Sequence, residues 1–85
     1  MLVIVDVLRA DSSIPSDALQ NVDLALEAAG LRKQIRSVLV PEKHYSTTYE
    51  ASAIEKSAVE KILAPIAEAN QILVSVEIEE SVSFP

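Results

Sequence analysis

The stretch Leu2–Leu8, LVIVDVL, decides the fold that we predict for this chain. Its run of β-branched and leucine side chains indicates a β-strand. Alternation along a strand sends successive side chains to opposite faces, and here both faces are mainly apolar. Two apolar faces are typical of a strand in the middle of a sheet. One face carries Val3, Val5 and Val7, and the other carries Leu2, Ile4, Asp6 and Leu8.

A helix is predicted after a loop at Arg9–Pro15. Ser16 is expected to be its N-cap, and Gly30 stands where a helix commonly stops. Between these two residues, apolar side chains recur at helical spacing and predict one buried stripe. The stripe consists of Leu19, Val22, Leu26 and Ala29.

Two further strands are predicted next, over Leu31–Val40 and over His44–Tyr49. Pro41 ends the first of them, because proline cannot donate a hydrogen bond to a sheet. Strict alternation would divide the first strand into two faces. One would carry Leu31, Lys33, Ile35, Ser37 and Leu39, and the other Arg32, Gln34 and Arg36.

A second helix and a last strand complete the pattern. Capping-box patterns stand at Ser52–Glu55 and Ser57–Glu60, and the second agrees better with the apolar stripe that follows. Pro65 predicts a kink or a break in this helix, and Asn70 is expected to close it in a left-handed conformation. The last strand is expected over Gln71–Glu79, and residues 81–85 form a short tail. The helix stripe is Val59, Ile62, Leu63 and Ile66, and the inward side of the strand is Ile72, Val74, Val76 and Ile78.

The element order β-α-β-β-α-β predicts a single α+β domain over residues 1–85. With right-handed crossovers, the compact arrangement is ferredoxin-like: a four-stranded antiparallel sheet with two helices on one face. The other face stays uncovered, so we expect Leu2, Ile4 and Leu8 to lie in a homodimer interface. The expected core is Val3, Val5, Val7, Leu19, Val22, Leu26, Ile62, Ile66, Val74 and Val76.

The composition bounds the function classes. Thirteen acids against seven bases give a net charge of −6, which repels phosphate backbones, so nucleic acid is not an expected partner. The absence of cysteine excludes disulfides, thiolate metal sites and cysteine nucleophiles. No apolar stretch approaches the roughly 20 residues of a membrane span, and the amino-terminal residues do not resemble a signal peptide. We expect a cytoplasmic protein that does not contact membranes.

Asp6 is the first residue that could carry chemistry, because a carboxylate in an apolar strand needs water or a partner. It could bind a metal ion at the open face of the sheet. It could instead be a partly exposed acid paired with Arg32 or Arg36, and we favour this second interpretation.

The other candidates are weaker. His44 is the only histidine, and without a partner in the sequence we expect it at the surface. The basic cluster Arg32, Lys33 and Arg36 could touch phosphates or balance Asp6 and Glu77 across the sheet. The single glycine leaves no glycine-rich phosphate loop.

One family resemblance rests on three segments: VIVDVL with its internal Asp6, AAGLRKQIRSVLV, and QILVSVEI after a helix. In this order of elements the chain resembles the CRISPR-associated small-nuclease superfamily, which includes virulence-associated protein D. The resemblance implies a ferredoxin-like dimer in which an aspartate of the first strand serves metal-dependent cleavage of nucleic acid. By position, only Asp6 can take that role.

Three functions remain open from the sequence. We favour a non-enzymatic homodimeric module for protein interaction or regulation, whose partner is itself or another protein and which needs no cofactor. The first alternative is a nuclease that uses Asp6 with magnesium or manganese at a dimer interface. The second alternative is a small-molecule sensor dimer.

Overall fold

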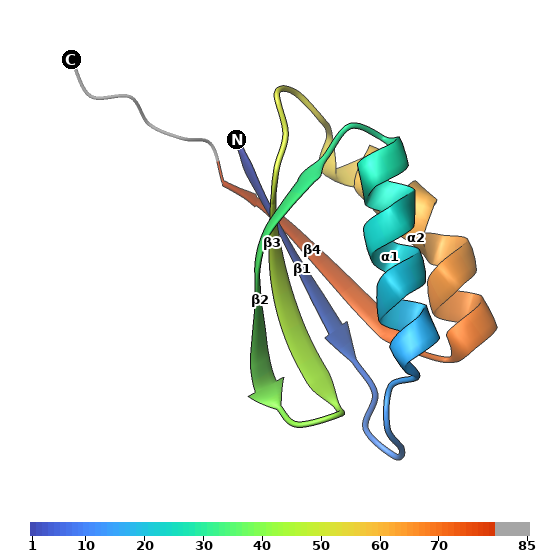
Figure 1. Cartoon of the computed structure of the whole chain (residues 1–85). Coiled ribbons are helices and arrows are strands. Elements are labelled where there is room, and N and C mark those ends of the chain that lie inside the picture. The colour runs from blue at the N-terminus through green and yellow to red at the C-terminus, as the bar shows by residue number, and fades with distance from the viewer. Residues whose placement is uncertain (80–85) are drawn as a thin grey trace.

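The computed structural model describes residues 1–79, which form one sheet with two helices (Figure 1). The strand order is β2-β3-β1-β4, and each neighbouring pair is antiparallel. The predicted ferredoxin-like α+β arrangement is therefore confirmed, while the expected tail at residues 81–85 lies outside the described residues. The elements are β1 (Leu2–Leu8), α1 (Ser16–Ala28), β2 (Arg32–Val40), β3 (His44–Glu50), α2 (Lys56–Asn70) and β4 (Leu73–Glu79).

Both helices cover the same face of the sheet, and the core lies between them and β1 (Figure 1). Val3, Val5 and Val7 are fully buried there, as predicted for the central strand. Four expected core residues are only partly buried at its margin: Leu19, Ile62, Ile66 and Val74. Their place in the centre is taken by fully buried side chains that include Val59, Leu63, Leu31 and Tyr49.

Helix α1 ends as the sequence predicts but begins without a side-chain cap. Gly30 has a φ of 94°, which glycine adopts without strain. The Leu31 N–H donates to the Leu26 carbonyl, and this bond together with the left-handed glycine forms a Schellman motif. Ser16 was expected as the N-cap, but it is the first helical residue, and Pro15 precedes it without a side-chain cap.

Helix α2 differs from its prediction at both ends. It begins at Lys56, and no side chain caps it, so neither capping box forms. Pro65 lies inside the helix without breaking it. The left-handed residue is Gln71, with a φ of 54°, while the Asn70 side chain donates to the Ile66 carbonyl instead. The predicted closing residue is therefore wrong by one position. None of the helices in residues 1–79 has the length and apolar character that a membrane crossing requires.

Strand β2 does not alternate as predicted, because it contains two bulges. Its nine residues pair with the seven of β3, and the register steps over Gln34 and Leu39. A bulge places one extra residue against the partner strand, so side chains beyond it change faces. Lys33 pairs with Tyr49 and Arg36 pairs with Thr47, so both cations share the helix-covered face. The prediction that Lys33 and Ile35 share a face is wrong for this reason.

Candidate functional site

The face of the sheet turned away from both helices, here called the open face, carries residues in register across the four strands. Two adjacent rows differ sharply in chemistry. The polar row consists of Ser37, Ser46, Asp6 and Ser75, and the apolar row beside it consists of Val40, Leu8 and Leu73, with His44 between Val40 and Leu8. The predicted open-face residues Leu2 and Ile4 lie further along β1 and are half-buried, whereas Leu8 is exposed.

Asp6 lies beside His44, with 3.8 Å between Oδ1 of the acid and Nε2 of the imidazole. That separation exceeds hydrogen-bond distance, so the two form an ion pair only when the imidazole is protonated. The expected pairing of Asp6 with arginine is wrong, because Arg36 lies on the helix-covered face and Arg32 pairs with Glu50. Among residues 1–79, no third acid or histidine completes a metal-binding group with these two.

A shallow hollow of about 310 Å³ opens next to this pair. Its lining combines one carboxylate, one hydroxyl and a mostly hydrocarbon remainder. The residues are Asp6, Leu8, His44, Leu73, Val74 and Ser75. The hollow therefore joins the polar row to the apolar row of the open face.

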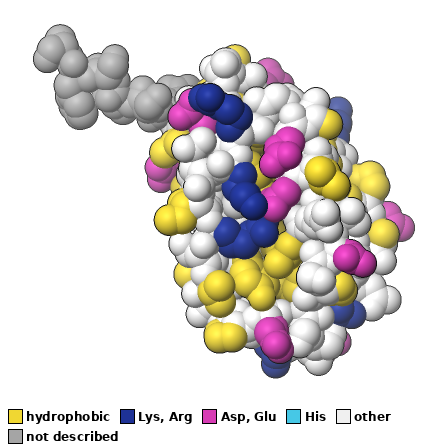
Figure 2. Space-filling model, in the orientation of Figure 1, with side chains coloured by type: hydrophobic (Ala, Val, Ile, Leu, Met, Phe, Trp, Pro, Cys, Tyr) yellow, Lys and Arg dark blue, Asp and Glu magenta, His cyan; other side chains and the backbone are white. Residues whose placement is uncertain are grey.

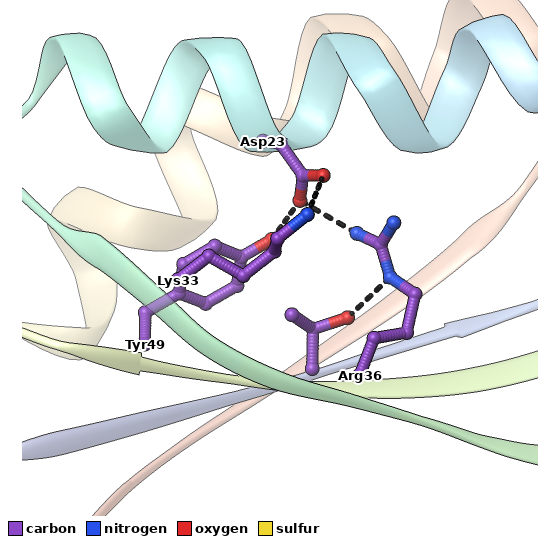
Figure 3. Close-up of polar contacts among 5 residues, drawn as sticks. Asp23, Lys33, Arg36 and Tyr49 are labelled. Atoms are coloured by element: carbon purple, nitrogen blue, oxygen red, sulfur yellow. Dashed lines mark hydrogen bonds and ion pairs between the residues drawn. The ribbon is translucent and has the colours of Figure 1, made fainter.

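A second polar cluster lies between α1 and the helix-covered face of the sheet, where Asp23 accepts three hydrogen bonds (Figure 3). The donors are the Tyr49 hydroxyl at 2.5 Å, Arg36 at 2.6 Å and Lys33 at 3.2 Å. Arg36 also donates through Nε to the Thr47 hydroxyl at 2.9 Å. The cluster ties α1 to β2 and β3.

The cluster shifts the acidity of two of its members. Burial by itself would raise the pKa of Asp23, but the Tyr49 hydrogen bond, the Arg36 charge and the Lys33 contact outweigh it and lower the pKa. Burial, and then the hydrogen bond to the Asp23 carboxylate, raises the pKa of the Tyr49 hydroxyl well above its ordinary value. Both groups therefore stay in one protonation state near neutral pH, and the cluster is structural.

The three cations of the predicted basic cluster, Arg32, Lys33 and Arg36, all form ion pairs within the chain. Lys33 and Arg36 neutralise Asp23, and Arg32 pairs with Glu50, rather than with Asp6 or Glu77. Figure 2 shows a line of basic side chains on this side of the molecule, with acidic side chains beside them.

The sequence analysis did not identify Asp23 as the acid that pairs with Lys33 and Arg36. Its position was informative: it stands four residues after Leu19 and three before Leu26, on the stripe predicted to be buried. A buried acid of this kind requires a cation or donors nearby.

The third feature is the edge of the sheet at β2. Four of the seven large hydrophobic side chains that are exposed among residues 1–79 belong to this one strand. Their exposed fractions are 61% for Ile35, 56% for Val38, 56% for Leu39 and 46% for Val40. An apolar edge strand presents both unpaired backbone groups and hydrocarbon to its surroundings.

Comparison with known proteins identifies solved structures with a similar fold. No family model matches the chain, and no curated protein matches its sequence. An ACT domain protein from Streptococcus pneumoniae has a similar structure: TM-score 0.69, 12% identity, 91% of this chain and 88% of that chain covered. A formyltetrahydrofolate deformylase from Pseudomonas putida is similar at TM-score 0.66 and 7% identity, over 92% of this chain but only 28% of that chain. At such identities the likeness shows a shared ferredoxin-like fold.

Proposed function

We propose that this chain is a regulatory module that works as a homodimer, with two copies meeting at the β2 edge. The observation that carries the proposal is the concentration of exposed aliphatic side chains on that strand. A domain of this size has a small core, so covering this hydrocarbon with a second copy would add stability that the single chain lacks.

A second copy suits this edge better than an unrelated polar partner does. The cations of β2 are already engaged by Asp23 and Glu50 within the same chain, so the edge offers mainly apolar contact. Between its two bulges, β2 keeps a regular register over residues 35–38. A segment of this length can add backbone hydrogen bonds to the apolar contact when two edges pair.

The open face offers a second dimer interface, through Leu2, Ile4 and Leu8. Only Leu8 is exposed in this set, and Leu73 lies directly opposite it on β4. The smaller exposed area leads us to rank this face below the β2 edge.

The regulatory part of the proposal is supported by the fold. The likeness to an ACT domain protein favours a small regulatory or ligand-sensing module. The likeness to 28% of a deformylase chain indicates that a domain of this shape can accompany other domains. The module would then act by changing its assembly state or by holding a ligand, rather than by chemistry of its own.

Sedimentation velocity at roughly tens of micromolar tests the dimer, because a modest interface should assemble in that range. We expect the unmodified chain to sediment as a dimer and Leu39→Lys to sediment as a monomer. The matched control is Leu24→Lys on α1, since Leu24 is 54% exposed and Leu39 is 56% exposed. Both variants remove the same side chain and add the same charge.

The outcomes separate the two interfaces. A monomer in Leu39→Lys with a dimer in Leu24→Lys supports the β2 edge. A dimer that survives Leu39→Lys but dissociates in Leu8→Lys would move the interface to the open face. An unmodified chain that stays monomeric at these concentrations would overturn the proposal.

A further inference from the structure

We propose that the hollow at Asp6 is a binding site for a small primary amine that carries an apolar group. The ligand's ammonium would lie against the polar row, and its hydrocarbon part would lie over the apolar row. This site goes beyond the proposed dimer, because one chain supplies all of its residues.

The polar end of the hollow offers acceptors in the number that an ammonium needs. Asp6 pairs in register with Ser75 on β4, and both line the hollow, so two carboxylate oxygens and one hydroxyl oxygen give three acceptors. Directly paired residues in an antiparallel sheet have side chains roughly 5 Å apart, close enough to share one ligand atom. An ammonium has three donors, and hydrogen bonds from it to a carboxylate are among the stronger ones.

The charge around Asp6 leaves its carboxylate available. Arg32, Lys33 and Arg36 are engaged by other acids. Within residues 1–79, the one ionisable neighbour recorded for Asp6 is His44, at 3.8 Å. A half-exposed acid with so weak a partner gains more from a cationic ligand than a saturated acid such as Asp23 would.

The apolar end of the hollow is formed by two leucines. Leu8 and Leu73 pair directly across β1 and β4, one residue pair beyond the row of Asp6 on the same face. Leu73 is 68% exposed, which makes it the most exposed large hydrophobic side chain in the described part of the chain. A ligand that covers both leucines would remove this hydrocarbon from water.

The same surroundings discriminate against other ligand classes. Glu77 lies on the open face two residues from Ser75, and the chain as a whole has a net charge of −6, so a carboxylate or phosphate ligand is repelled. The volume of about 310 Å³ is at the lower limit of small-molecule sites, which restricts the apolar part to roughly a single ring. An arylalkylamine meets both conditions.

The test compares three probes that share a phenethyl group and differ in their polar end: phenethylamine, phenethyl alcohol and phenylpropionate. Each is titrated into the isotopically labelled chain near neutral pH while amide chemical shifts are recorded. We expect phenethylamine to shift the amides of Asp6, His44 and Ser75. The neutral alcohol should bind about tenfold more weakly, and the carboxylate should not bind in the same range.

Two variants and one control locate the site. Asp6→Asn keeps the shape of the side chain and should lower the affinity for phenethylamine about tenfold or more, while leaving affinity for the alcohol nearly unchanged. Leu73→Ala should weaken the amine and the alcohol alike. Leu24→Ala, on α1, should change neither.

Each outcome decides the proposal. Equal binding of amine and carboxylate, shifts away from the hollow, or unchanged affinity in Asp6→Asn would overturn it. Because sedimentation reports the dimer separately in the same samples, a dimer that binds no amine refutes only the site. A monomer that binds the amine through Asp6 refutes only the dimer.

Discussion

The hydroxyl of Tyr49 on β3 donates a 2.5 Å hydrogen bond to Oδ1 of Asp23 on α1, joining residues twenty-six positions apart. Tyr49→Phe should lower the free energy of unfolding by about 1 kcal/mol, because Asp23 keeps its bonds to Lys33 and Arg36. Urea denaturation measures the loss, and the same variant should raise the pKa of Asp23 in an NMR titration. Tyr45→Phe, on the same strand but outside the cluster, is the control. Equal losses in the two variants would contradict the role given to the bond.

The cluster of Asp23 should make stability depend on pH in one direction. The pKa of Asp23 lies below its ordinary value of 3.8, so its contribution is present above that value and is lost as the pH falls through the folded-state pKa. Asp23→Asn should therefore cost about 1–3 kcal/mol at neutral pH and progressively less in acid. Denaturation curves from neutral pH to about pH 3 measure this difference, with Glu27→Gln on the exposed side of α1 as the control. A difference that stays constant with pH would show that the carboxylate charge is not what stabilises the fold.

Two neighbouring residues of α2 differ in how deeply their side chains are buried. Leu63 is fully buried, whereas Ile62 lies partly exposed at the margin of the core. Leu63→Ala should cost about 2–5 kcal/mol, because it leaves a cavity, and Ile62→Ala should cost clearly less. Thermal unfolding of both variants measures the contrast. The reverse order would mean that the helix is rotated about its axis from the arrangement described.

Gln71 stores backbone strain at the end of α2. Its φ of 54° is a left-handed conformation, which costs a residue with a Cβ about 1 kcal/mol. Gln71→Gly should therefore raise the free energy of unfolding by a similar amount. Gln20→Gly, in the interior of α1, should instead lower it by about 1 kcal/mol. Two losses of stability would show that Gln71 is not held in this conformation.

The nuclease alternative stays a prediction, and a metal titration tests it. One carboxylate beside one imidazole holds magnesium weakly, so calorimetry should find no micromolar binding of magnesium or manganese to the unmodified chain. Micromolar binding that disappears in Asp6→Asn, together with metal-dependent cleavage of RNA or DNA, would make the nuclease the preferred function.

The fold could be predicted because its signals are local. The apolar run at Leu2–Leu8 and the glycine stop at Gly30 act over a few residues, and both appear where the sequence indicates. The bulge at Gln34 could not be predicted, because the alternation of polar and apolar residues in the sequence does not indicate where a strand contains an extra residue.

The candidate sites could be predicted only in part, because they depend on contacts between residues far apart in the sequence. Asp6 was rightly expected on the open face, but its neighbour is His44, brought there by the pairing of β1 with β3. Once the bulge is missed, Arg36 is assigned to the wrong face. Asp23 is then overlooked as its partner.

The extra residues of β2, Gln34 and Leu39, affect where the strand can lose a residue without changing its contacts. Because the register steps over Gln34, deleting that residue leaves Lys33 on the helix side and Ile35 on the open side, as before. The ion pairs to Asp23 would be kept, because Lys33 and Arg36 would both stay on the helix-covered face. Natural relatives could thus lose a residue here without losing the link between strand and helix, and length variation among homologues is expected at this position.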